Sequence, residues 1–142
     1  MDCEFTDEER CEACEMVNKL SKPSQWERIL VSAAGAIGVD FSPDVLQIGD
    51  SEKGWLSFEI TETEYIEGTE GLFLNGLTLR ISISNRDRLR TSALCDVLIQ
   101  ILSKRKLIRN VVAIEWSFDV DTNVRTAAMT VDINPYTQRS PT

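Results

Sequence analysis

The stretch of residues 77–133 constrains the fold of this chain most, because its hydrophobic pattern predicts a strand, a helix and a hairpin in direct succession. Apolar and polar residues alternate over 77–84, which is the period of a strand with one buried face. Apolar residues then recur at helical spacing along 86–106, and Asn85 is the predicted helix cap. The predicted buried stripe of this helix consists of Leu89, Ala93, Leu94, Val97, Leu98, Ile101 and Leu102.

A C-terminal hairpin is predicted over 111–134. Alternate residues of its first strand form an apolar face that we expect to be buried: Val112, Ile114, Trp116, Phe118 and Val120. Aspartate and asparagine at 121–123 favour a turn, after which the alternation resumes over 127–133. Pro135 ends the second strand, because proline has no N–H to donate to a sheet.

Two helices are predicted in the first 40 residues. Thr6 and Glu9 have the spacing of a capping box, so the first helix begins near residue 7 and runs to about residue 20. Ser24 is the predicted cap of the second helix, and Gly38 is its predicted end. The apolar face of the second helix consists of Trp26, Ile29, Leu30, Ala33, Ala34 and Ile37.

Two strands are predicted between the second helix and residue 77. One is short and lies around residues 45–48, and the other spans 55–64. Trp55 has the opposite alternation from the apolar Leu56, so we expect Trp55 to face a partner, since aromatic residues are enriched at interface cores.

The predicted elements run α-α-β-β-β-α-β-β, which indicates an α+β fold with helices packed on one face of a mainly antiparallel sheet. A chain of 142 residues is normally one domain, which we place at 1–136, with a flexible tail at 137–142. Five of the first ten residues are acidic, which argues against a signal peptide. We therefore expect the protein to stay in the compartment where it is made, away from membranes.

Charge is distributed unevenly along the chain. The net charge of −8 argues against direct binding to nucleic acid, which needs a basic surface. Residues 1–71 hold 17 acidic and 5 basic side chains, whereas residues 72–142 hold 6 acidic and 10 basic ones. A solvated acidic N-terminal region would explain this asymmetry. Head-to-tail self-association would explain it as well, with the acidic part of one copy against the basic part of the next.

The four cysteines, Cys3, Cys11, Cys14 and Cys95, are incomplete candidates for a zinc site. The chain has no histidine, and the spacing lacks the second close pair of common zinc modules. A redox CxxC is expected near a βαβ pattern, which this sequence does not have. We therefore expect no bound metal. We expect Cys11 and Cys14 to pack as small apolar side chains on one face of the first helix.

No catalytic site and no cofactor are predicted. Without histidine, no Ser–His–Asp or Cys–His nucleophile pair can form, and no glycine-rich phosphate-binding motif occurs. A group of glutamates lies on and beyond the strand at 55–64, and its members are Glu59, Glu62, Glu64, Glu67 and Glu70. These residues lack the order of a calcium-binding EF-hand loop, so we interpret them as a solvated acidic face.

This pattern resembles the tail-terminator and tail-completion proteins of long-tailed bacteriophages. The matching segments are the strand at 55–64, the strand at 77–84, the helix at 86–106 and the hairpin at 111–134. The resemblance implies a virion structural protein without enzymatic activity, made in the host cytoplasm and located in the tail or neck. It implies a hexameric ring that caps the tail tube and joins it to the head, with tail-tube and connector proteins as partners. The additional N-terminal helix departs from the pattern, so a baseplate or other neck position stays open.

A ring of this kind implies one repeated contact between unlike surfaces of neighbouring copies. The five glutamates named above are the acidic candidates for this contact, with Trp55 beside them. The basic candidates are Arg86, Arg88, Arg90, Lys104, Arg105 and Arg109. A small acidic secretion chaperone is the alternative, since such proteins have a similar size and form dimers.

Overall fold

The computed structural model describes residues 4–41 and 53–135. Within these ranges the chain forms three helices: α1 (Asp7–Leu20), α2 (Gln25–Ile37) and α3 (Arg88–Lys104). The strands are β1 (Asp40–Phe41), β2 (Trp55–Gly68), β3 (Gly71–Asn85), β4 (Ile108–Asp119) and β5 (Val124–Ile133). The α-α-β-β-β-α-β-β order predicted from the sequence is confirmed. The short strand predicted at 45–48 and the tail at 137–142 lie outside the described residues.

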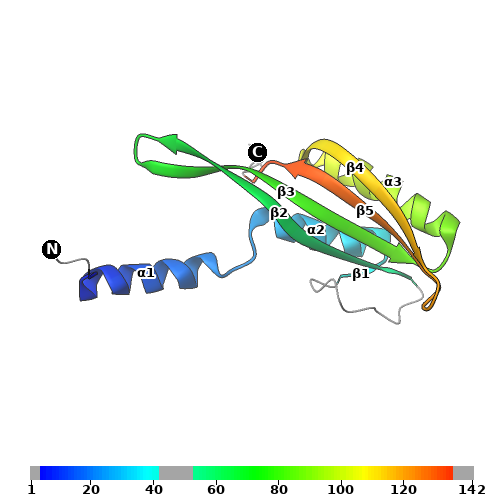
Figure 1. Cartoon of the computed structure of the whole chain (residues 1–142), viewed down its shortest axis with the longest axis horizontal. Coiled ribbons are helices and arrows are strands. Elements are labelled where there is room, and N and C mark those ends of the chain that lie inside the picture. Colours follow the sequence, from blue (N-terminus) through cyan, green and yellow to red (C-terminus); the bar gives the residue numbers. More distant parts are fainter. Residues whose placement is uncertain (1–3, 42–52, 136–142) are drawn as a thin grey trace.

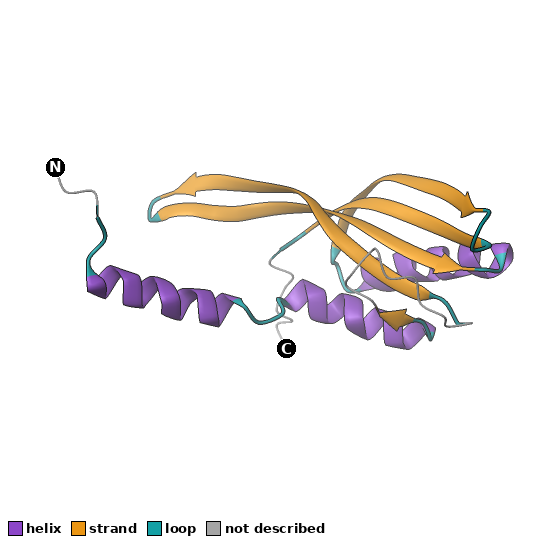
Figure 2. Ribbon diagram, turned by 60° about the horizontal axis from the view of Figure 1, so that its bottom comes forward, coloured by secondary structure: helices purple, strands orange, loops and turns teal. Residues whose placement is uncertain are grey.

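The five strands form one sheet in the order β1-β2-β3-β5-β4. The short β1 is parallel to β2, and every other neighbouring pair is antiparallel. Helices α2 and α3 lie on one face of this sheet, as Figure 1 and Figure 2 show. The fold is therefore α+β, as the hydrophobic periods predict. No helix within residues 4–41 and 53–135 has the length and apolar character needed to cross a membrane.

The core lies between the sheet and the helix pair. Its fully buried large side chains include Leu30, Leu56, Leu79, Ile81, Ile83, Leu98, Leu102, Leu107, Met129, Val131 and Ile133. The alternating residues of 77–84 supply one of its walls, as predicted. Each buried side chain of this size contributes about 1.5–3 kcal/mol. Helix α1 contributes none of them, since none of its residues is buried.

The buried face of α3 is rotated from the predicted one. It consists of Thr91, Leu94, Cys95, Leu98 and Leu102, at spacings of three, one, three and four. Leu89 and Val97, which the sequence pattern places in the stripe, are 66% and 42% exposed. The cap is also displaced, because Asp87 rather than Asn85 precedes the helix and accepts the Leu89 N–H.

Ser24 and Asn85, the predicted caps of α2 and α3, do not make capping hydrogen bonds with their side chains. Ser24 stands at the N-cap of α2, but its side chain makes no capping hydrogen bond. Asn85 is buried, and its side-chain oxygen accepts the N–H of Asp87 two residues on. Asn85 therefore orients the turn between β3 and α3 without capping the helix.

The hairpin of β2 and β3 extends well beyond α2 and α3 (Figure 2). Its strands pair as far as Gly68 opposite Gly71, so only Thr69 and Glu70 form the turn. The register shifts where Glu64 faces Gly76 but Tyr65 faces Leu74, which leaves Asn75 as the extra residue of a bulge. Bulges increase the local twist, and this one lies where the hairpin leaves the body of the sheet.

Candidate functional site

Three surfaces of the protein could bind another protein. They are the hairpin of β2 and β3, the edge strand β4 and the helix α1. The exposed large apolar side chains of the described residues concentrate there. On the hairpin they are Ile60, Tyr65, Ile66, Leu72 and Phe73. On β4 they are Val112, Trp116 and Phe118, and on or beside α1 they are Phe5, Met16, Val17 and Leu20. Exposed apolar groups of this extent are typical of interaction sites.

The acidic candidates of the sequence pattern all lie on or at the tip of the hairpin, and all are exposed. Glu64 is not free, because its side chain accepts a hydrogen bond from the Asn75 amide. Arg109 Nη2 donates to the Asn75 carbonyl at 3.0 Å. A polar recess of about 200 Å³ lies beside these groups, lined also by Glu62 and Asp132. One acidic candidate, Glu64, and one basic candidate, Arg109, therefore both bind Asn75 at the base of the hairpin within a single chain.

The remaining acidic candidates differ in their surroundings. Glu59 faces Arg80 across the β2–β3 pair, and Arg80 Nη2 also lies 3.4 Å from a carboxylate oxygen of Glu115. Glu67 lies opposite Leu72, next to the turn. Glu70 is in the turn itself and is exposed. Glu67 and Glu70 are thus the acidic candidates placed furthest from the body.

Arg86, Arg88 and Arg90 lie at the opposite end of the long strand β3, around the start of α3. Glu64 pairs with Gly76, and the ten residues of β3 from Gly76 to Asn85 separate this position from the three arginines. At about 3.3 Å per residue this is about 33 Å. The structure therefore places Glu67 and Glu70 at the opposite end of the molecule from these three arginines, as Figure 1 shows for the hairpin tip and the start of α3. This arrangement suits a head-to-tail contact.

Trp55 is not the exposed aromatic that the alternation suggests. Its side chain is only 6% exposed. It is flanked by Asp40 of β1 and Ser84 of β3, and Ser84 and Ser57 beside it are buried as well. The expectation that Trp55 faces a partner is wrong, because its side chain is already buried within a single copy.

Trp116 and Phe118 form an exposed aromatic surface on β4 that we expected to be buried. They pair with Ala127 and Arg125, so they lie on the same side of the sheet as the helices. Helix α3 packs mainly over β3 and β5, however, and β4 is the edge strand beyond it. Trp116 is therefore 57% exposed and Phe118 46% exposed. A recess of about 450 Å³ opens beside them, lined also by Arg88, Thr91, Ser92, Ser117 and Arg125.

A bulge explains the other departure in β4. The pairing register shifts between Val111 and Ala113, so Val111 packs against the core and Val112 is 56% exposed. Each bulge changes which alternate residues face the core. Uninterrupted alternation through 112–120 is therefore a wrong expectation.

Helix α1 projects away from the sheet, and none of its residues is buried (Figure 1). Cys11 and Cys14 are consequently exposed, so the expectation that they pack as small apolar side chains is wrong. Cys95 is buried in the core on α3, where burial and, secondarily, the charge of Asp96 raise the pKa of its thiol to about 11. Cys3 lies outside the described residues. Within residues 4–41 and 53–135, no three cysteine, aspartate or glutamate side chains are grouped as metal ligands.

No protein-family model matches this chain, and a search of curated proteins found no match.

Proposed function

We propose that this protein is a structural subunit of a ring that ends the tail tube of a long-tailed bacteriophage and joins it to the head. The observation that carries the proposal is the placement of exposed apolar side chains on elements that extend beyond the packed core. Large aromatic and aliphatic side chains at the hairpin tip, on β4 and along α1 are exposed in a single copy. Contacts with neighbouring subunits would bury them.

The charge geometry supports one repeated contact between unlike ends of the molecule. Glu67 and Glu70 lie at the tip of the hairpin, and Arg88 and Arg90 lie at the far end of β3. A contact that joins opposite ends of identical copies closes into a ring when its rotation is right. Complementary charge at such a contact fixes register and partner choice.

The first test is the mass and shape of the assembly. Sedimentation velocity and negative-stain electron microscopy of the protein, alone and with purified tail tubes, should show six-subunit rings. Salt should weaken the assembly, because exposed charges are screened over about 8–10 Å at ordinary ionic strength. A compact dimer unaffected by tail tubes would indicate the chaperone alternative. A monomer with and without tail tubes would contradict the proposal.

A charge-reversal series then tests the contact itself. Glu67→Arg with Glu70→Arg should weaken assembly, and adding Arg88→Glu with Arg90→Glu should partly restore it. Glu64 is left intact, because its hydrogen bond to Asn75 maintains the base of the hairpin. The matched control is Asp96→Arg with Asp121→Arg, which makes the same change in net charge at two exposed residues elsewhere. Equal weakening by the control would show that net charge, and not this contact, matters.

A further inference from the structure

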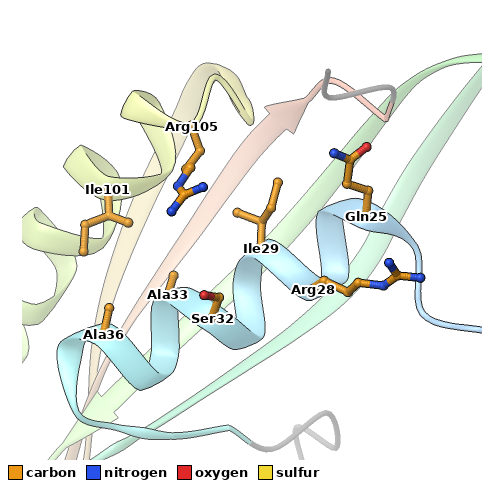
Figure 3. Close-up of a pocket in the computed structure, with 8 residues that line it drawn as sticks. All are labelled: Gln25, Arg28, Ile29, Ser32, Ala33, Ala36, Ile101 and Arg105. Atoms are coloured by element: carbon orange, nitrogen blue, oxygen red, sulfur yellow. The ribbon is translucent and has the colours of Figure 1, made fainter. Parts of the chain in front are cut away.

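A shallow groove runs between α2 and α3 on the side of the helices away from the sheet. Figure 3 shows its wider part, where Ile29, Ala33 and Ala36 of α2 face Ile101 of α3. This part has a volume of about 310 Å³, and a second part of about 220 Å³ is lined by Ala93 and other residues. Ala36 and Ile101 line both parts, so the groove is continuous. Small side chains on α2 let another helix approach closely.

The groove carries a single sign of charge. Arg28 and Arg105 line the wider part, as the close-up in Figure 3 shows, and Arg90 lines the second part. No acidic side chain is among the residues that line either part. An apolar floor with arginines at its borders fits an amphipathic helix with acidic flanks.

Helix α1 has the complementary character. One side of its C-terminal half is apolar and comprises Ala13, Met16, Val17 and Leu20, whereas Glu9, one turn before Ala13, carries a charge on the same side. Glu8, Glu12 and Glu15 follow the i, i+4, i+7 spacing, so they form an acidic row along a border of that side, which Lys19 ends in the last turn. The apolar and acidic side chains of α1 are all exposed.

The lengths of helix and groove also agree. At 1.5 Å per residue, the 14 residues of α1 are about 21 Å long, and the 13 residues of α2 are about 20 Å long. The apolar residues within α1, from Ala13 to Leu20, therefore extend over about 11 Å, roughly half of the groove.

We propose that α1 of one copy binds in the α2–α3 groove of the next copy. In each copy α1 continues away from the body beyond the start of α2, and it leaves its own groove uncovered (Figure 1, Figure 2). Each copy thus offers one acidic amphipathic arm and one basic apolar groove, which is the condition for head-to-tail assembly. The inference rests on the proposed self-assembly and adds a second contact to it, distinct from the hairpin.

A pair of glutamate substitutions tests the face of α1. Met16 lies on the apolar side, and Asn18 lies about 200° further round the helix. Met16→Glu and Asn18→Glu add the same charge to exposed positions of the same helix. Met16→Glu should weaken assembly at least about tenfold, because it places a charge against the groove floor. Asn18→Glu should leave assembly unchanged, and equal effects of the two variants would overturn the proposal.

Disulfide trapping distinguishes binding between copies from folding back within one copy. The exposed Cys11 and Cys14, together with Cys3, are first replaced by serine, and the buried Cys95 stays. One chain then carries Ala13→Cys on α1, and a second chain of different tagged mass carries Ser32→Cys in the groove. Mild oxidation of the mixture should link the two different chains. The control pair with Asn18→Cys in place of Ala13→Cys should link much less.

The outcomes separate this inference from the proposed function. If rings form but no link joins the two chains, the groove inference is overturned and the ring proposal stands. A third variant carries Ala13→Cys and Ser32→Cys in the same chain. If its only disulfide forms within one chain, α1 folds back on its own groove, which also overturns the inference. If the parent does not assemble under any condition, both proposals fail.

Discussion

The guanidinium carbon of Arg125 lies 4.4 Å from the centroid of the Phe118 ring on the neighbouring strand. Its Nη1 also donates a hydrogen bond of 2.9 Å to the Arg86 carbonyl, just before α3. Arg125 thereby links β4, β5 and the turn into α3. It also holds one wall of the recess beside Trp116.

Arg125→Ala should lower the free energy of unfolding by about 1–2 kcal/mol. It removes a cation–π contact of about 0.5–1 kcal/mol at an exposed site and a hydrogen bond of similar net value. Denaturant unfolding of the monomer measures this difference. Arg86→Ala is the matched control, since the acceptor at residue 86 is a backbone carbonyl that survives the change. A loss for Arg125→Ala within the about 0.5 kcal/mol of ordinary surface substitutions would contradict the prediction.

Leu98→Asp should abolish folding, or lower the free energy of unfolding by more than about 4 kcal/mol. Leu98 is fully buried at the centre of the core, and the change leaves an unpaired charge among apolar side chains. Val97→Asp adds the same charge one residue earlier, where the side chain is 42% exposed. It should cost under about 1 kcal/mol. Thermal unfolding at low protein concentration compares the two, and similar melting temperatures would show that the helix face is wrong.

The comparison of Leu98 with Val97 shows what hydrophobic period alone can predict. The period locates the helix and its central buried residue correctly, because Leu94, Leu98 and Leu102 pack on the sheet. It cannot separate this face from a second apolar row, such as Val97 and Ile101, that faces the groove beside α2. Both rows are apolar, and only the position of α2 decides which one is fully covered.

The strand β4 shows the same limit for the candidate interface. Alternation predicts that Trp116 and Phe118 lie on the apolar face of their strand, and this face is indeed the one on the same side of the sheet as the helices. Their exposure follows from the order of strands, since β4 is the edge and α3 does not reach beyond it. The order of strands depends on contacts between residues distant in sequence, so the local hydrophobic pattern cannot predict it.

Helix α1 was predictable in extent but not in environment. Its capping box and length agree with the structure, because both depend on residues close in sequence. Its lack of any buried residue depends on where the chain turns at 21–24. The low density of apolar residues on α1 was the available signal that this helix is not part of the core.

Thiol reagents should modify Cys11 and Cys14 rapidly and Cys95 only on unfolding. The two cysteines of α1 are exposed, whereas burial raises the pKa of the Cys95 thiol to about 11. The thiolate is the reactive species, so Cys95 is unreactive at pH 8 for reasons of both access and ionisation. Mass spectrometry after alkylation in native buffer and in denaturant counts the modified residues. Labelling of Cys95 in the native protein at the rate of Cys14 would contradict the prediction.

The raised pKa of Cys95 also fixes the sign of a pH effect. The unfolded thiol loses its proton at lower pH than the folded one, from an ordinary value of 9.0 against about 11. The folded state therefore binds more protons in this interval, and stability falls as pH rises from 9 towards 11. Cys95→Ala should flatten this part of the stability profile. An unchanged slope in Cys95→Ala would show that other groups cause it.

The start of α1 should lose its order as pH falls below the ordinary glutamate pKa of 4.5, through one carboxylate. The Glu9 carboxylate accepts the Thr6 N–H at 2.9 Å, and hydrogen bonding from the Thr6 backbone and then from its side chain holds the pKa of Glu9 below its ordinary value of 4.5. In return, Thr6 Oγ1 accepts the Glu9 N–H at 3.1 Å. The stabilisation is present above the unfolded pKa and disappears as pH falls through the lower folded pKa. Because α1 has no tertiary packing, its capping bonds decide how far its first turn frays.

Amide hydrogen exchange at residues 9 and 10 should accelerate at low pH, after correction for the intrinsic rate. Glu9→Gln keeps an acceptor without a titrating charge, so its exchange should not show this acceleration. Identical pH profiles for the parent and Glu9→Gln would assign the fraying to another group.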